Sequence, residues 1–374
     1  MGHLAFFDIQ LKNTMGNIME NMTVNPESAP KKGYAWFVLF MLIVLYFLNV
    51  IDRTLASGLL DDIKKTYQVS DIFMGFLTGP AFAVVYTTLA IPIARFADRM
   101  NRVKIIVAGA VVWSFFTVMS GLSPTPWTFA FSRMGVGIGE AAFIAPAFSL
   151  LSDYFPPKRR ALAFALLNFG SYFGQMTAYT AGPAIAEATS WQHAFIYLGA
   201  PGLFIGLMTL IFVKEPERGR LDTDSKHGAG AHVPLPFFST VKALFARRSF
   251  LFMALGTACG GFGSYAIGFW APTLFSRAFE LSLKEAGQRY GLASFAAGIT
   301  GALLLGIVCD LMASKDSRWP FRLSATGLLG FLASMMAMCF VTNVNVATAL
   351  CIPAGLMAGG WVIAMQSALQ DLLP

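Results

Sequence analysis

Long apolar segments alternate with short polar connections along almost the whole chain. A helix needs roughly 20 apolar residues to cross the hydrocarbon core of a bilayer, because each residue advances it by only about 1.5 Å. Ten segments meet this requirement: 34–60, 72–96, 105–123, 127–152, 161–186, 194–213, 249–277, 287–312, 321–341 and 345–372. The pattern therefore predicts an all-α membrane protein with about ten spanning helices.

Two longer polar stretches suggest how the chain is organised. Residues 1–33 read as a mobile N-terminal tail, and they form too long a lead for a cleavable signal peptide. Residues 214–248 contain Pro, Gly and many charged side chains, as a linker between domains does. We therefore expect a six-helix bundle at 34–213, a cytoplasmic linker at 214–248 and a second bundle, with four helices, at 249–374.

The distribution of Lys and Arg predicts the orientation of the helices. When the N-terminus is placed in the cytoplasm, 20 of the 27 Lys and Arg residues lie in cytoplasmic segments and five lie on the opposite side. Loops rich in Lys and Arg stay on the cytoplasmic side of a membrane. We therefore expect a multi-pass protein of a bacterial inner membrane or plasma membrane, with its N-terminus in the cytoplasm.

Composition excludes several other classes of protein. The chain is 56% hydrophobic and only 13% charged, which is too little charge for a soluble domain of this size. Its net charge of +7 does not indicate nucleic-acid binding, because the basic residues form short clusters between apolar segments. No nucleotide-binding motif and no nucleophile–base pair stand out, so we expect neither an ATP-driven pump nor an enzyme. The cysteines lack metal-site spacing, and we expect no metal or cofactor; they are Cys259, Cys309, Cys339 and Cys351.

Two helix-end patterns recur in the two halves of the chain. Asp98 ends the second apolar segment, and Asp310 ends the eighth in a similar way. The sequence Asp153-Tyr-Phe-Pro ends the fourth segment, and Asp371-Leu-Leu-Pro ends the tenth at nearly the same offset. Parallel repeats of this kind are typical of carriers whose site lies between two halves. Because two more segments follow the pattern in the first half, we expect helices eleven and twelve to be missing from this sequence.

The motifs resemble those of the major facilitator superfamily. The loop Asp98-Arg99-x-x-Arg102 is similar to its signature loop, and 133–140 on the fourth segment is similar to its second motif. The resemblance implies two six-helix bundles related by a pseudo-two-fold axis. It also implies that Asp98, Arg99 and Arg102 act as a conformational latch at the cytoplasmic side. The loop departs from the superfamily pattern where Gly is usual, at Ala94 and Asn101.

A narrower resemblance concerns the spinster branch of this superfamily. It rests on Asn49-Val-Ile-Asp52-Arg53 in the first segment, Gly139-Glu140-Ala141 in the fourth, and the Ala-Asp-Arg-x-Asn-Arg loop. That branch includes sphingosine-1-phosphate and lysolipid carriers. Carriers of sugar acids and organic anions share the Asp-Arg pair on the first helix, so they remain an alternative.

Four ionisable residues lie deep inside the predicted spans: Asp52, Arg53, Arg133 and Glu140. Charges at this depth cost several kcal/mol and are rarely left without a partner or a function. Arg133 and Glu140 are seven residues apart and therefore lie on one face of their helix. We expect a cluster in which Asp52 faces Arg133, Glu140 lies deeper and Arg53 points toward a cavity. The alternative is a set of fixed ion pairs that lock the first helix to the fourth.

The expected roles follow from the chemistry of these groups. We expect Asp52 and Glu140 to take up protons and Arg133 to tune Asp52. The planar donor fork of Arg53 suits an anionic head such as phosphate or carboxylate. Gly135 and Gly139 should allow close packing against the first helix.

Polar and aromatic residues inside the spans are candidates to line the cavity, although each of them alone is more often a packing residue. They are Tyr46, Asn49, Tyr86, Asn168, Tyr172, Gln175, Tyr265, Trp270, Trp361 and Gln366. Because the second half adds no charge in mid-membrane, one cavity wall should be charged and the other apolar.

Together these features favour a secondary transporter, coupled to protons, that moves an anionic amphipathic substrate or organic anion by alternating access. We expect a monomer whose partners are protons, a small-molecule substrate and the bilayer. One alternative is a proton-coupled carrier of sugar acids or other small carboxylates. Another is a receptor or channel on the same scaffold that does not transport.

Overall fold

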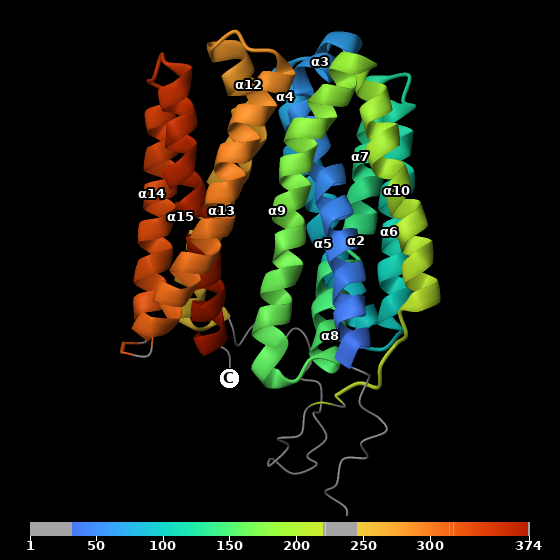
Figure 1. The fold of residues 1–374 in the computed structure, drawn as a ribbon, viewed down its shortest axis with the longest axis vertical. Coiled ribbons are helices and arrows are strands. Elements are labelled where there is room, and N and C mark those ends of the chain that lie inside the picture. Colours follow the sequence, from blue (N-terminus) through green and yellow to red (C-terminus); the bar gives the residue numbers. More distant parts are fainter. Residues whose placement is uncertain (1–31, 220, 222–244, 314, 317, 373–374) are drawn as a thin grey trace, which may run out of the picture.

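The computed structural model describes residues 32–219, 221, 245–313, 315–316 and 318–372. The expected tail, apart from its last two residues, and most of the expected linker lie outside these residues, as do the side chains of Asp310, Gln366 and Asp371. Long helices run side by side, and no strand occurs in the described part of the chain (Figure 1). The all-α prediction is confirmed.

The spanning helices follow the predicted segments closely. In the first half they are α2 (Lys32–Gly58), α4–η2–α5 (Asp71–Phe76, Leu77–Ala81, Phe82–Ala97), α6 (Arg102–Gly121), α7 and α8 (Pro126–Glu140, Ile144–Tyr154), α9 (Pro157–Ala188) and α10 (Trp191–Phe212). In the second half they are α12 (Arg248–Ala278), α13 (Leu283–Ala313), α14 (Trp319–Met338) and α15 (Val344–Leu372).

Nine spans in the described residues are long and apolar enough to cross a membrane. The remaining long helix, α9, carries more polar side chains, among them Asn168, Tyr172 and Gln175. It packs between α2 of the first half and α13 of the second. A helix that faces protein on two sides needs less apolar surface than one that faces lipid.

The structure departs from the predicted segments in three places. The fourth span is broken at 141–143, just before Pro146, which cannot donate a backbone hydrogen bond to Ala142. The second span contains the π-helical turn η2 around Pro80, for the same reason. A short amphipathic helix that the sequence analysis did not predict, α3 (Leu60–Tyr67), follows the first span.

Apolar side chains fill the interior of the first half at two levels. Trp113 and Phe143 are fully buried near the middle, and Phe129 and Trp191 are buried nearer the end that carries α3. We call that end the far end. The opposite end, where α2 begins and where α10 stops at Phe212, is called the linker end.

Glycines on α7 permit close packing, but against a different helix from the expected one. A Cβ at Gly139 would lie 2.4 Å from the backbone nitrogen of Trp113, and a Cβ at Gly135 would overlap the ring of Phe116. Both neighbours belong to α6. The expectation that these glycines pack against the first helix is therefore wrong. They lie on the face of α7 that contacts α6.

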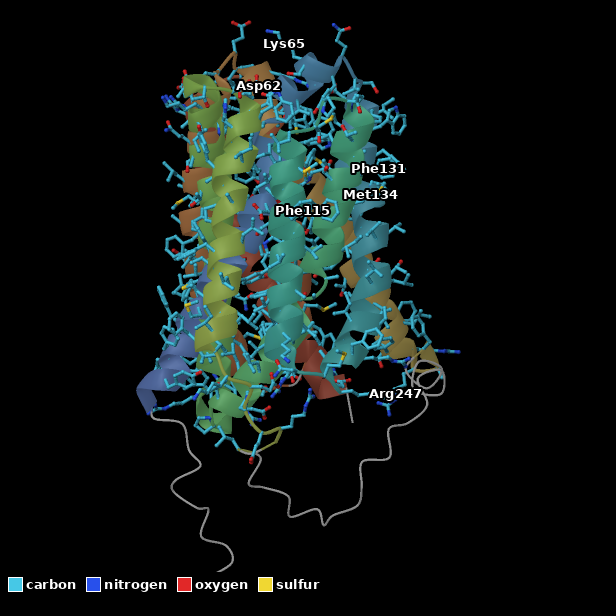
Figure 2. All side chains as sticks on the ribbon, turned by 90° about the vertical axis from the view of Figure 1, so that its right-hand side faces the viewer. Asp62, Lys65, Phe115, Phe131, Met134 and Arg247 are labelled. Atoms are coloured by element: carbon cyan, nitrogen blue, oxygen red, sulfur yellow. The ribbon has the colours of Figure 1, made fainter. Side chains whose placement is uncertain are left out.

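The outer surface fits a bilayer. Figure 2 shows Asp62 and Lys65 at the far end and Arg247 at the linker end, with Phe115, Phe131 and Met134 on the lateral face between them. Phe131 is 68% exposed, which is typical of a side chain that faces lipid.

The two halves approach each other mainly toward the far end. Helices α9 and α13 lie close together in the upper part of Figure 1 and diverge toward the linker end. Their contacts run from Lys284 and Glu187, which form an ion pair of 3.2 Å, to Phe295, which packs against Tyr172.

Candidate functional site

An ion pair joins the first and fourth spans in the interior of the first half. Nε and Nη2 of Arg53, on α2, each lie 2.6 Å from Oε2 of Glu140. Glu140 is the last residue of α7 and is buried, whereas 24% of the Arg53 side chain remains exposed. The pair therefore has one enclosed partner and one that reaches outward.

Asp52 lies beside this pair without a direct partner. The residue is fully buried, and neither carboxylate oxygen has a hydrogen-bond partner among the described residues. Glu140 and Arg133 are close enough to interact with it electrostatically. The neighbouring hydroxyl of Thr117 instead donates to the carbonyl of Trp113, at 2.9 Å.

Arg133 completes the cluster; it lies on α7, seven residues before Glu140. Its Nη2 donates to the backbone carbonyl of Arg53 at 3.2 Å, and its guanidinium lies 5.9 Å from the ring centre of Phe195. Its Nη1 has no hydrogen-bond partner in the described part of the chain. Four buried or half-buried charges thus meet between α2 and α7, together with unpaired donor and acceptor atoms.

The outward side of Arg53 reaches across to the second half. Its guanidinium lies 4.9 Å from the ring centre of Tyr86 and 5.6 Å from that of Phe82, both on α5. Its Nη1 donates to the hydroxyl of Tyr265 on α12 at 3.0 Å. Arg53 therefore contacts a carboxylate of one half and a phenol of the other.

The structure brings the four predicted charges together, although their pairing differs in one respect. The sequence predicted that Arg53 points toward a cavity and named no carboxylate partner for it, whereas in the structure Arg53 pairs with Glu140. The spacing of seven residues placed Arg133 and Glu140 on one face. It could not show how α2 is rotated about its axis, which decides whether Asp52 or Arg53 meets Glu140.

The other candidates fall into two groups. Tyr86 and Tyr265 contact Arg53, and Asn49 is buried one turn before it with Nδ2 unpartnered in the described chain. Tyr46 stacks on Phe143 (5.4 Å) and is also close enough to Arg53 to interact with it electrostatically. The rest lie elsewhere or are packing residues: Tyr172 packs on Phe295, Asn168 donates to its own helix, Trp270 packs near Gly75, Trp361 is buried against α14, and Gln175 is exposed.

The three predicted latch residues lie at the linker end in different surroundings. Arg102 is buried, and its guanidinium lies 2.6 Å from Asp153 of α8 and 2.6 Å from Glu215, just after α10. Asp98 and Arg99 are exposed. Arg102 thus holds the first half together, and a latch role for Asp98 and Arg99 stays a prediction.

The segment after α10 also belongs to this network and was not predicted from the sequence. Arg218 donates to the carbonyl of Ala97 at 2.7 Å and to that of Met100 at 2.5 Å, and Gly219 donates to Asp153 at 2.9 Å. The signal was present in Glu215-Pro-Glu-Arg218, a charged cluster directly after a spanning helix.

We expect Arg102→Lys to lower the free energy of unfolding by about 1–3 kcal/mol, because an ammonium cannot bind two carboxylates in the fork geometry of a guanidinium. Thermal unfolding of the purified protein would measure this. Arg99→Lys is the matched control on the exposed side of the same loop. Equal melting temperatures for the two variants would contradict the structural role of Arg102.

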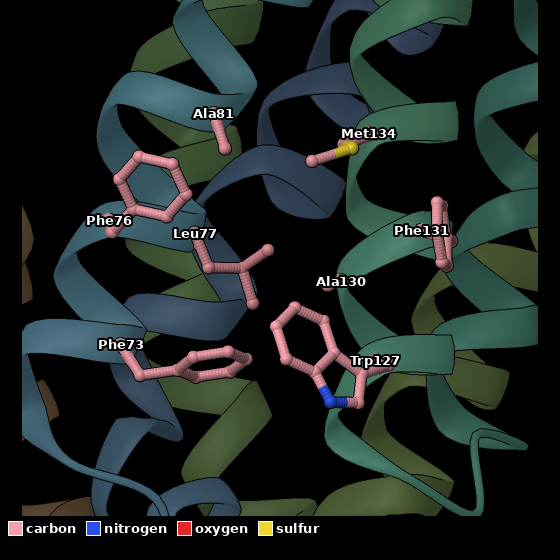
Figure 3. A pocket seen from close by; sticks show the side chains of 8 residues that line it. All are labelled: Phe73, Phe76, Leu77, Ala81, Trp127, Ala130, Phe131 and Met134. Carbon is pink, nitrogen blue, oxygen red and sulfur yellow. The ribbon is translucent and has the colours of Figure 1, made fainter.

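A separate apolar pocket lies at the lateral surface of the first half, toward the far end. It lies between α4–η2 and α7, and Phe73 and Trp127 face each other across it (Figure 3). None of the four charged residues lines it. No cluster of potential metal ligands occurs in the described part of the chain.

An all-α membrane fold with a charged cluster between its first and fourth spans defines a class of polytopic membrane proteins. The chain belongs to the Major Facilitator Superfamily, whose family model matches residues 42–374. This confirms the superfamily resemblance.

Comparison with individual proteins supports the spinster resemblance. An MFS-type efflux pump of Mycolicibacterium smegmatis is 28% identical over 81% of this chain and 69% of its own length. Protein spinster homolog 1 of Xenopus tropicalis is 30% identical over 76% and 56%, and a sphingosine-1-phosphate transporter of Danio rerio is 26% identical over 87% and 68%. The chain thus spans between 56% and 69% of the length of these three relatives.

A solved structure shares the fold. It is the crystal structure of a bacterial homolog of the human lysosomal transporter spinster, in an inward-facing and unoccupied conformation. It is 29% identical to this chain, with a TM-score of 0.77 over 92% of this chain and 77% of the other.

Proposed function

We propose that the chain is the transporting part of a secondary carrier, coupled to protons, that moves an anionic amphipathic substrate by alternating access. The observation that carries this proposal is the position of Arg53. It is the partly exposed member of a buried charge cluster, and it contacts both halves of the protein.

Proton coupling is supported by the state of the carboxylates. Asp52 has no hydrogen-bond partner among the described residues, and Oε1 of Glu140 has none among them either. A buried carboxylate in a membrane needs either a counter-charge or a proton. We infer that a proton on Glu140 releases Arg53, and that Arg53 then binds the anionic head of the substrate.

An amphipathic substrate is supported by the surroundings of Arg53. Aromatic rings of Phe82 and Tyr86 flank its guanidinium, so a charged head would bind next to apolar surface. One relative is named as a sphingosine-1-phosphate transporter, which agrees with a head of this kind. We place the linker end in the cytoplasm, because most Lys and Arg residues lie there.

Small carboxylates such as sugar acids are the second candidate, because Arg53 would bind their carboxylate equally well. A non-transporting receptor or a channel is the third.

Counterflow in liposomes separates these possibilities. Liposomes that contain the purified protein would be loaded with unlabelled lysophospholipid or with unlabelled sugar acid, and uptake of the same compound in labelled form would be followed. We expect exchange of the lysophospholipid. Exchange of the sugar acid alone would favour the second candidate, and no exchange of either would overturn a carrier role for these substrates.

A further inference from the structure

Helix α12 contains a proline that removes one of its own hydrogen bonds. In an α-helix each carbonyl accepts from the N–H four residues later, and Pro272 has no N–H to offer Gly268. Inside a bilayer no water replaces the missing donor, so this carbonyl needs a partner from elsewhere in the protein.

The partner comes from the other half of the molecule. The hydroxyl of Tyr179, on α9, donates to the carbonyl of Gly268 at 3.0 Å. The hydroxyl of Ser57, on α2, donates to the next carbonyl, that of Phe269. Two first-half side chains thus bind the stretch of α12 that Pro272 weakens.

Tyr179 is held firmly in this position. It is a first-half residue that is buried in the apolar core of the second half, with its ring centre 5.5 Å from that of Tyr290. Gly287 and Gly291 of α13 make room for it, since a Cβ at Gly291 would lie 3.1 Å from the Cβ of Tyr179. Packing of this kind holds the phenol oxygen within hydrogen-bond distance of the carbonyl of Gly268.

Helix α12 contacts the first half on either side of Gly268 along its length. Tyr265 accepts from Arg53 in the charged cluster, and Arg277 forms ion pairs with Asp61 of α3 and Asp71 of α4 at the far end. Tyr265, Gly268 and Phe269 are three to four residues apart, so they line one side of the helix, whereas Arg277 lies more than two turns further along and is not on that face. Gly268 lies between the charged cluster and the ion pairs.

We propose that Tyr179 is a positioning residue of the transport cycle, which supplies the hydrogen bond that Pro272 removes from α12 and so stabilises closure of the far end. The proposal rests on alternating access as set out above. When the halves separate at the far end, Gly268 loses this donor, and water that enters the opening takes its place. Without Tyr179 the closed arrangement would leave the carbonyl of Gly268 unpaired while the open one would not, so the hydrogen bond removes a cost of closing.

Amide hydrogen exchange of the purified protein, followed by mass spectrometry, tests this without a substrate. We expect Tyr179→Phe to raise exchange in 53–67 and 265–280 several-fold, because the far end opens more often. Tyr290→Phe removes a hydroxyl from the same cluster without touching Gly268, and it should leave exchange there within twofold of the parent protein.

The decisive variant is Pro272→Ala, which gives Gly268 a donor within its own helix. In that background Tyr179→Phe should change exchange by less than twofold. An equal rise with and without Pro272 would show that the hydroxyl does not act by replacing the donor that Pro272 lacks, and it would overturn the proposal. If Pro272→Ala does not fold, the two Tyr→Phe variants decide alone, and equal exchange in both would overturn the proposal.

These outcomes are independent of the substrate. Exchange that follows the expected pattern in a protein that transports nothing would leave the role of Tyr179 in closure intact and would remove the proposed function. Normal transport with no effect of Tyr179→Phe on exchange would support the proposed function and would overturn the role of Tyr179 in closure.

Discussion

Glu140→Gln should reduce substrate uptake driven by a pH gradient to the level of liposomes without protein. Glutamine keeps the shape of the side chain but cannot take up and release a proton, and it no longer neutralises Arg53, which lies 2.6 Å from Glu140 in the parent protein. Asp52→Asn should have the same effect, because Asp52 is buried beside that pair. Uptake at several external pH values, with and without a gradient, measures both variants.

Exchange without a gradient provides the internal control. We expect both variants to retain counterflow of labelled for unlabelled substrate, since counterflow needs alternating access but no net proton movement. Glu285→Gln is the matched control, because Glu285 forms an exposed ion pair with Arg289 four residues further along the same helix. Uptake that stays fully dependent on the pH gradient in Glu140→Gln and Asp52→Asn would show that these carboxylates do not carry the protons.

Most of the fold could be predicted because the bilayer restricts it. Apolar length and backbone hydrogen bonding leave helices as the choice for these segments, so the predicted and observed spans agree within a few residues. The helix α9 shows where this reasoning weakens. Its segment, 161–186, was predicted with the others, but its polar side chains face neighbouring helices and lower its hydropathy below that of the other nine spans.

Local breaks were harder to predict, because they depend on single prolines. Pro146 interrupts the fourth span and Pro80 gives a π-helical turn, yet Pro272 and Pro183 lie inside continuous helices. The sequence does not show which carbonyl will find another donor. For Gly268 that donor is Tyr179, 89 residues away, and it became apparent only when α9 and α12 were seen together.

For the candidate site, too, the residues could be predicted from the sequence, but their pairing could not. Intramembrane charges are so costly that Asp52, Arg53, Arg133 and Glu140 stood out at once. Their pairing depends on helix rotation within the packed bundle, which no spacing along one helix determines. Arg102 was expected in a latch, but its burial between two carboxylates depends on Glu215, which lies beyond the last span of the first half.

Gly287→Ala should open the far end more strongly than any removal of a hydroxyl. A Cβ at Gly287 would lie 2.0 Å from the backbone carbonyl oxygen of Tyr179, so the two helix backbones would have to move apart. Overpacking of this kind costs about 1–3 kcal/mol. The cost falls only on the arrangement in which α9 and α13 touch, and it corresponds to a shift of about 5- to 150-fold toward the open arrangement.

Hydrogen exchange in 53–67 and 265–280 should therefore rise in Gly287→Ala, and transport should slow because the far end closes less often. Gly261→Ala is the matched control: Gly261 lies inside α12, and a Cβ there meets nothing within 4 Å. Both substitutions add one methyl group and raise helix propensity equally. A difference between them thus measures the contact at Tyr179, and identical exchange would mean that α9 and α13 do not form the far-end closure.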